Sequence, residues 1–182
     1  MNRFHEQQRR HACNEDGVET IERLRKILPE ENITNGVAKV STTIKTPGII
    51  KQTGDFRTFI FAECDNRPSN RIEAFQKAIT KAGAFAPETI DIDKEMWSKF
   101  ILFSAISGAT AAGRCTLGQV IKSTSLSKVF QKIISETTAT ARAYEINLSS
   151  SIEQDIWTRA NELPSEGRAS TAVDLEKGLP LE

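Results

Sequence analysis

The sequence predicts an α+β protein in which a short β-rich segment is followed by an all-helical remainder. Between residues 37 and 62, β-branched side chains alternate with polar ones, which is typical of strands. From residue 70 onward, apolar side chains recur at the three- and four-residue spacing of amphipathic helices. This change of pattern predicts a boundary between the α+β front and the helical back near Ala86-Pro87.

The front part is expected to begin with a loose polar tail and one helix. Residues 1–12 show no apolar period, whereas residues 18–28 carry apolar side chains at helical spacing. Pro29 lacks a backbone donor and ends this helix.

Three short strands are expected after this helix. They are predicted at residues 37–44, 49–53 and 58–62. The turn sequences Thr46-Pro47-Gly48 and Gly54-Asp55 separate them. Because these connections are too short for a crossover, the strands should form an antiparallel meander.

Five helices are expected in the rest of the chain. They are predicted at residues 70–82, 91–112, 126–146, 150–163 and 170–177. Asn70 with Glu73, and Ser150 with Glu153, have the spacing of a capping box, and Ser170 is expected to cap the last helix.

The composition argues against several classes of partner. Lys plus Arg and Asp plus Glu each number 24, so the formal net charge is zero and nucleic acid is not an expected partner. The cysteines and histidines, which are Cys13, Cys64, Cys115, His5 and His11, lack the spacing of a zinc site, and free thiols in a reducing compartment are expected.

No segment predicts secretion or a membrane span. Residues 1–11 are polar and basic, unlike a signal peptide, and the uncharged run over residues 100–112 is too short to cross a bilayer. These observations predict a soluble cytoplasmic protein that does not bind a membrane.

The sequence contains no recognisable nucleotide-binding loop. Neither the GxGxxG of a dinucleotide fold nor the Gly-Lys-Ser/Thr of a P-loop occurs. The nearest glycine cluster, at residues 108–113, lies within an apolar helical segment and follows no strand.

Lys99 is the first candidate for chemistry. It lies in an apolar helical segment with no polar face. Because burying an ammonium group is costly, such a lysine either extends to water or serves a purpose such as proton transfer. A second candidate is the segment from Ser170 to Glu182, although the segment alone also fits a short solvent-facing helix with a Gly and Pro stop.

Several short motifs follow one another in a fixed order over residues 13–182. They are Asp16-Gly17-Val18, Thr46-Pro47-Gly48-Ile49-Ile50, Phe61-Ala62-Glu63-Cys64-Asp65, Ser69-Asn70-Arg71, Trp97-Ser98-Lys99-Phe100 and the string from Ser170 to Glu182. In order and spacing they resemble the ketopantoate reductase (2-dehydropantoate 2-reductase) family. In that family, NADPH delivers hydride to the ketone of 2-dehydropantoate, giving pantoate for coenzyme A synthesis.

The resemblance implies roles for five residues. Lys99 would act as the general acid toward the carbonyl oxygen. Ser107, Ser170 and Glu182 would bind the 2-oxo acid substrate, and Asp16 and Glu182 would lie at the NADPH site. The sequence departs from the family pattern at three of its asparagine positions, which are Asp16, Phe103 and Ser107 here. Phe103 and Ser107 could mark a subgroup that acts on another 2-oxo acid.

The resemblance also implies a domain organisation. Residues 1–12 would be an unmatched tail and residues 13–87 the distal part of an NADP-binding Rossmann-type domain. Residues 88–182 would form a helical substrate-binding and catalytic domain like the C-terminal domain of 6-phosphogluconate dehydrogenase. Without the glycine-rich segment, this truncated chain is expected to be inactive alone.

Two further readings remain open. One is a non-catalytic helical module that keeps the interaction or homodimerisation surface of such an enzyme. The other is an unrelated helical protein in which the motif matches arise by chance.

Overall fold

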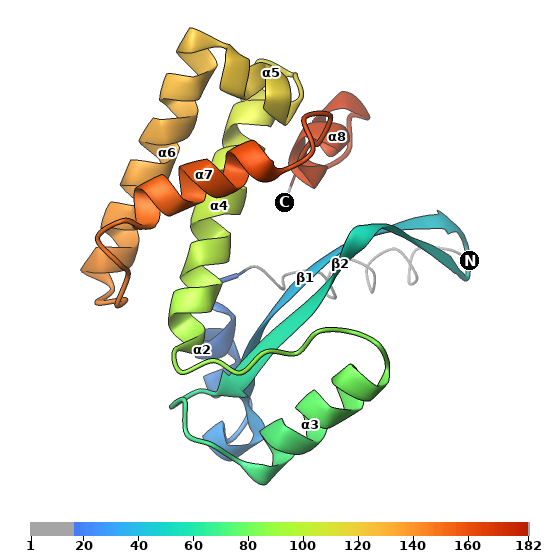
Figure 1. Cartoon of the computed structure of the whole chain (residues 1–182), viewed down its shortest axis with the longest axis vertical. Coiled ribbons are helices and arrows are strands. Elements are labelled where there is room, and N and C mark those ends of the chain that lie inside the picture. The colour runs from blue at the N-terminus through green and yellow to red at the C-terminus, as the bar shows by residue number, and fades with distance from the viewer. Residues whose placement is uncertain (1–16, 182) are drawn as a thin grey trace. The chain divides into compact units, whose positions relative to one another are not determined.

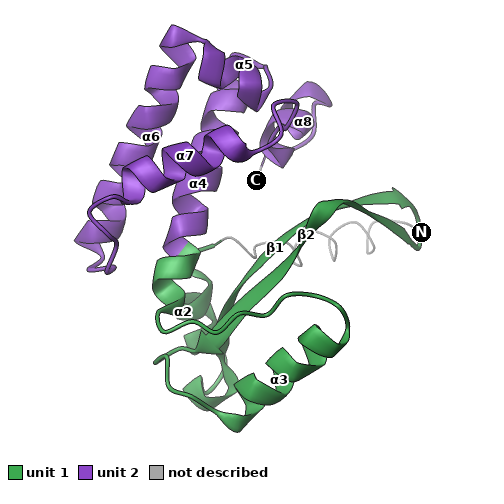
Figure 2. Ribbon diagram, in the orientation of Figure 1, with its two compact units in different colours: residues 1–96 green, residues 97–182 purple. Residues whose placement is uncertain are grey.

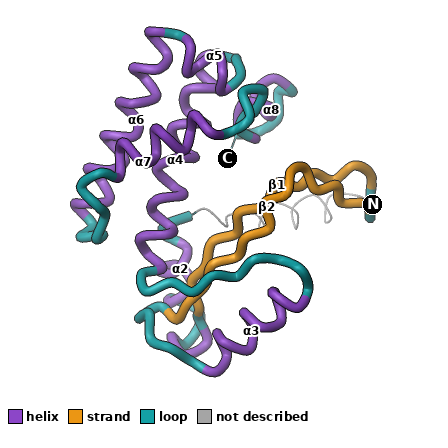
Figure 3. Tube along the Cα trace, in the orientation of Figure 1, coloured by secondary structure: helices purple, strands orange, loops and turns teal. Residues whose placement is uncertain are grey.

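The computed structural model describes residues 17–181, which form two compact units joined within one helix, between Met96 and Trp97 (Figure 2). A two-stranded antiparallel sheet is followed by a mostly helical C-terminal region (Figures 1 and 3). The predicted α+β class is therefore confirmed.

The sheet of the first unit is one long hairpin of strands β1 (Thr34–Thr46) and β2 (Ile49–Glu63). The prediction of a third strand after a turn at Gly54-Asp55 is wrong, because β2 runs through these residues. The register shifts there, from Thr42 opposite Gln52 to Val40 opposite Arg57. Gly54 has a φ of +73°, which lets β2 take up the extra residues as a bulge and not as a chain reversal.

The hairpin is buried at its base and exposed toward its tip. Val37 and Ile60 are paired across the strands near the base, and both are buried. Ile44 and Ile50, paired near the tip, are 67% and 71% exposed. The apolar burial by which the sheet stabilises the fold is therefore at its base, where Ile60 and Ala62 form a small core with Ile92.

The first helix is shorter than the sequence predicts. Helix α2 (Thr20–Arg25) stops before Pro29, because the N–H of Ile27 donates to the carbonyl of Leu24 in a tighter turn. A 3₁₀ turn, η1 (Glu30–Asn32), then leads into β1.

Helix α3 (Asn70–Lys81) has the predicted length but a different cap. Ser69 is the N-cap residue, and its Oγ accepts a hydrogen bond from the N–H of Ile72 at 3.3 Å. The prediction of a capping box formed by Asn70 and Glu73 is therefore wrong. Gly83, at a φ of +83°, follows the end of the helix as predicted.

The second unit is helical. It contains most of α4 (Ile92–Gly113), together with α5 (Leu117–Lys122), α6 (Thr124–Ala143), α7 (Ile152–Glu162) and α8 (Ser170–Glu176). The four longer predicted helices after residue 90 are confirmed within a few residues. Helix α5 was not predicted, although Thr116 and Gln119 form a complete capping box at its start.

Two predicted helix caps are wrong. The capping box at residues 150–153 does not form, since Ser151 is the N-cap residue of α7 and donates its hydroxyl to Asp155 Oδ2 at 2.9 Å. Ser170 is the first residue inside α8, and Ala169 precedes it as the N-cap residue without a side-chain hydrogen bond.

The core of the second unit lies between α4, α5, α6 and α7. Ile101, Phe130, Ile134 and Val120 are all buried, and the ring of Phe130 lies edge-on to Trp157, with 5.8 Å between centroids. Among the described residues, no helix has both the length and the apolar character needed to cross a membrane.

Thr138 is a weak point of this core. It is fully buried on α6, and its Oγ1 has no hydrogen-bond partner among the described residues. A buried hydroxyl without a partner costs about 1–3 kcal/mol. We expect Thr138→Val to raise the free energy of unfolding by about 1 kcal/mol, measured by chemical denaturation. Thr140→Val, at an exposed position of the same helix, is the control, and a loss of stability in the Thr138 variant would contradict the prediction.

Candidate functional site

Lys99 lies in the first third of α4 and is half-buried. Its Nζ is 5.5 Å from the centroid of the Phe103 ring, one helical turn later, within the range of a cation–π contact. The ammonium group therefore combines partial access to water with an apolar neighbour.

Aromatic packing fixes this end of α4 within the second unit. Trp97 is buried, and its ring lies 5.6 Å from those of Phe100 and Tyr144, the residue that follows α6. Trp97 is two residues before Lys99, so these contacts hold the backbone from which the lysine extends.

Ser107 lies on the same face of α4 as Lys99, two turns later, and is half-buried. Each four-residue step drifts about 40° around a helix, so Ser107 is turned about 80° from Lys99, and the eight residues rise about 12 Å. Lys99, Phe103 and Ser107 therefore form one stripe along α4, referred to below as the Lys99 stripe. The stripe presents an ammonium group, a phenyl ring and a hydroxyl group in that order.

Ser170 lies on a separate helix of the same unit. Its side chain is exposed at the start of α8, whereas the neighbouring Ala169 and Ala172 are buried. Backbone hydrogen bonds from the N–H of Leu117 to the carbonyl of Gly167 (2.9 Å) and from Gly118 to Ser165 (2.8 Å) attach the segment before α8 to α5. The location of Ser170 is thus set by α5.

Asp16 and Glu182 lie outside the described residues. Their roles in binding cofactor and substrate stay predictions. Of the five predicted site residues, the structure places Lys99 and Ser107 on one face of α4, and Ser170 on a different helix.

The first unit contains an ionic cluster around the buried Glu63, whose members the sequence did not show to be neighbours. Glu63, at the end of β2, is 4% exposed and accepts hydrogen bonds from Arg71 Nε at 2.7 Å, from Arg71 Nη2 and from the Ser69 hydroxyl. Arg71 also donates to the backbone carbonyls of Glu31 and Ile33. These bonds from Arg71, with a further one from Ser69, lower the pKa of Glu63 to about 2.

The Glu63 cluster has a structural role. Both carboxylate oxygens of Glu63 accept hydrogen bonds from α3 or its cap, and Arg71 also bonds to η1, so the cluster joins β2 and η1 to α3. Two of the sequence motifs, the one ending at Asp65 and Ser69-Asn70-Arg71, are therefore partners of each other. The available signal was the eight-residue separation between a strand-end glutamate and a helix-start arginine.

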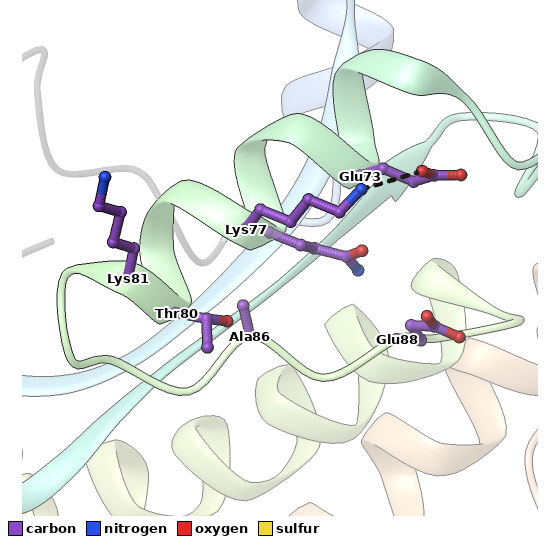
Figure 4. Close-up of a pocket in the computed structure, with 7 residues that line it drawn as sticks. Glu73, Lys77, Thr80, Lys81, Ala86 and Glu88 are labelled. Carbon is purple, nitrogen blue, oxygen red and sulfur yellow. Dashed lines mark ion pairs between the residues drawn. The ribbon is translucent and has the colours of Figure 1, made fainter.

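An open pocket of about 580 Å³ lies beside α3 (Figure 4). Lys77 and Glu73 form an ion pair at 3.6 Å on its wall, and Lys81 and Glu88 add one further charge of each sign. The pocket contains none of the predicted site residues, and its balanced, exposed charges define no ligand.

The described cysteines and acidic groups form no metal centre. Cys64 and Cys115 are free and half-buried, and burial raises the pKa of the Cys64 thiol. Within residues 17–181, no three His, Cys, Asp or Glu side chains come together as metal ligands. Cys13 lies outside the described residues.

The fold and the family profile define a class of protein. A sheet segment followed by a helical unit, with a lysine on the first long apolar helix, is the arrangement that the sequence motifs predict for an oxidoreductase of the ketopantoate reductase type. Residues 91–182 match the family profile "Ketopantoate reductase PanE/ApbA C terminal". The chain belongs to this family.

A curated relative and solved structures agree with this assignment. The 2-dehydropantoate 2-reductase of Archaeoglobus fulgidus is 26% identical over 170 residues, covering 92% of this chain and 55% of the relative. The 2-dehydropantoate 2-reductase structure from Geobacter metallireducens matches with a TM-score of 0.79 and 24% identity, covering 89% of this chain and 54% of its own. The chain spans about half the length of the curated relatives it matches.

Two other solved structures share the fold. D-mandelate dehydrogenase in complex with NADH has a TM-score of 0.79 and 17% identity over 90% of this chain and 56% of its own. A dimeric ketopantoate reductase from Staphylococcus aureus has a TM-score of 0.69 and 18% identity over 82% of this chain and 50% of its own.

Proposed function

We propose that this chain is the substrate-binding and acid-catalytic part of a cytoplasmic, NADPH-dependent reductase of the ketopantoate reductase type. Its substrate would be 2-dehydropantoate or a related 2-oxo acid, and its product the corresponding 2-hydroxy acid. The observation that carries the proposal is Lys99, a half-buried cation held beside an apolar ring on the helix that the family profile covers.

Lys99 would act as the proton donor in this reaction. Reduction of a ketone adds a hydride to the carbonyl carbon and a proton to the carbonyl oxygen. The Nζ of Lys99 would hydrogen-bond to that oxygen, stabilise the negative charge that develops on it and transfer the proton. The family resemblance assigns the hydroxyls of Ser107 and Ser170, and the carboxylate of Glu182, to holding the substrate.

The described residues do not fit the dinucleotide by themselves. Their only sheet has two antiparallel strands, and the sequence has no glycine-rich turn between a strand and a helix. NADPH would therefore have to be held by groups other than residues 17–181, and what these residues supply is substrate binding and acid catalysis.

The experiment compares the chain with Lys99→Ala and with Lys94→Ala, an exposed lysine on the same helix. Binding of 2-dehydropantoate is measured by calorimetry, and NADPH oxidation is followed by absorbance. We expect Lys99→Ala to weaken binding and to lower any kcat/KM by about 10²–10⁴, the usual contribution of a general acid. Lys94→Ala should match the wild type.

The alternative is a non-catalytic module that retains a dimerisation surface. It is favoured by the exposed Ile44 and Ile50 pair of the hairpin and by the dimeric relative from Staphylococcus aureus. Under this alternative, Lys99→Ala changes stability alone, and light scattering shows a homodimer. Binding of the 2-oxo acid that is equal in the wild type and Lys99→Ala would reject the reductase proposal.

A further inference from the structure

Helix α8 is short and has few anchors of its own. Its N-cap residue, Ala169, makes no side-chain hydrogen bond, and Ala172 is the buried residue within the helix. Backbone hydrogen bonds to α5 hold the segment that precedes it. Because a helix of seven residues is marginal unless other contacts hold it, the direction of the Ser170 side chain depends on contacts beyond the backbone of α8.

One such contact is an ion pair that extends along the helix. Arg168 Nη1 lies 2.5 Å from Glu176 Oε1. Arg168 precedes the N-cap residue, and Glu176 is the last residue of the helix. Seven helical residues span about 10 Å, so the two side chains must extend along α8 to meet. They are 32% and 43% exposed, which shows that each is partly covered.

The two charges are at the ends of α8 where the helix dipole does not favour them. A helix N-terminus carries partial positive charge and its C-terminus partial negative charge. The cation of Arg168 is nevertheless at the N-terminus, and the anion of Glu176 is at the C-terminus. The dipole therefore does not account for these charges, whereas their pairing joins the two ends of the segment that carries Ser170.

From this arrangement we propose that Arg168 is a positioning residue, which acts through Glu176 to fix the orientation of α8 and of the Ser170 hydroxyl. The proposal rests on the proposed function, in which Ser170 holds the 2-oxo acid, and extends it by naming what holds Ser170. Ser170 is exposed, and six helical residues turn it about 120° from Glu176. The ion pair therefore leaves the hydroxyl open to a ligand.

The size of the effect follows from the exposure of the pair. An exposed ion pair shifts a conformational equilibrium by up to about fivefold. A ligand that binds one orientation loses affinity in proportion to the fraction of chains that leave that orientation. We expect Arg168→Ala to raise the calorimetric dissociation constant of 2-dehydropantoate about two- to fivefold. Ser170→Ala, which removes the hydroxyl itself, should raise it about tenfold.

Three comparisons distinguish positioning from a general loss of stability. Arg168→Ala should have no further effect in a Ser170→Ala chain, because no hydroxyl remains to be positioned. Arg168→Glu should weaken binding although its charge suits the helix dipole, and combining it with Glu176→Arg should restore binding. Arg159→Ala removes a matched exposed pair with Glu162, at 3.2 Å on α7, and should bind like the wild type. Circular dichroism confirms that each variant is folded.

Failure of this inference is distinguishable from failure of the proposed function. The role of Arg168 is overturned if Arg168→Ala binds like the wild type, if its effect is the same with and without the Ser170 hydroxyl, or if the charge exchange binds no better than Arg168→Glu. In those cases, weaker binding by Lys99→Ala would still support the reductase proposal. If the wild type does not bind 2-dehydropantoate, or Lys99→Ala binds it equally well, the proposed function and the inference both fail.

Discussion

An Arg71→Ala variant is expected to be less stable than the wild type at neutral pH, by more than a surface ion pair contributes, because it removes two of the donors that hold the buried Glu63 carboxylate. Glu63 has a pKa of about 2, against an ordinary value of 4.5. The hydrogen bonds from Arg71 are the largest cause of this lowering, and the Ser69 hydroxyl, which the variant keeps, contributes a further part. The truncation also removes the hydrogen bonds to the carbonyls of Glu31 and Ile33.

The pH dependence of this loss has a definite sign. Because the pKa of Glu63 is lowered in the folded state, the cluster stabilises the fold fully above pH 4.5 and loses its contribution as the pH falls to about 2. Denaturant unfolding of the wild type and Arg71→Ala should therefore differ most at neutral pH and converge in acid.

Arg67→Ala is the matched control for this experiment. Arg67 pairs with Asp65 at 3.5 Å, but both side chains are more than 60% exposed. Such surface pairs contribute between zero and about 1 kcal/mol. An Arg71→Ala variant no less stable than Arg67→Ala would show that the Glu63 cluster does not hold α3 to the sheet.

Truncating Phe130 to alanine is expected to cost about 4 kcal/mol, the largest stability effect in the helical unit. Phe130 is fully buried on α6 and packs edge-on against Trp157 of α7. Its removal leaves a cavity in the core formed with Ile101 and Ile134, which a helical core refills only in part.

Val129→Ala provides the comparison, since Val129 is the adjacent residue and is 44% exposed. Chemical denaturation followed by circular dichroism should show little change for Val129→Ala and a large loss for Phe130→Ala. Similar losses for both variants would mean that the two helix faces are not distinguished as the structure shows.

The helices could be predicted from the sequence because their apolar positions repeat with the period of a helix. This signal is strong for long elements such as α4 and α6. It fails for α5, whose six residues include only two buried ones, Leu117 and Val120. Short helices are stabilised by packing and caps more than by their own period, so periodicity alone could not reveal α5.

The errors in the sheet and the caps have local causes. Gly54 fits a turn and a bulge equally well by residue type, and only the pairing with β1 decides between them. Ser151 and Ser170 have cap-forming side chains, but Ser151 bonds to Asp155 and Ser170 lies one position inside its helix. Residue type therefore indicates roughly where a helix begins. Whether the cap hydrogen bond forms depends on whether the serine is at the N-cap position itself.

The candidate site was predictable only in part. Lys99 stands out in the sequence because an ammonium group among apolar side chains is costly to bury, and its catalytic role stays a prediction. The exposure of Phe103 could not be predicted, since α4 is apolar around its whole circumference and no pattern marks one ring as facing solvent. The Glu63 cluster was also hidden, because its members come from a strand, a loop and a helix.

The attachment of α8 to α5 has a consequence for how such a site could change. A Cβ atom at Gly118 would lie 2.7 Å from Ser165 Cβ, so any side chain there would displace the segment that leads to Ser170. Under the proposed function, the reach of the Ser170 hydroxyl could then be adjusted without altering a residue that contacts the substrate. Libraries designed to alter substrate choice should therefore vary residues 116–119 as well as the Lys99 stripe, because α5 offers an adjustment that leaves the reacting groups in place.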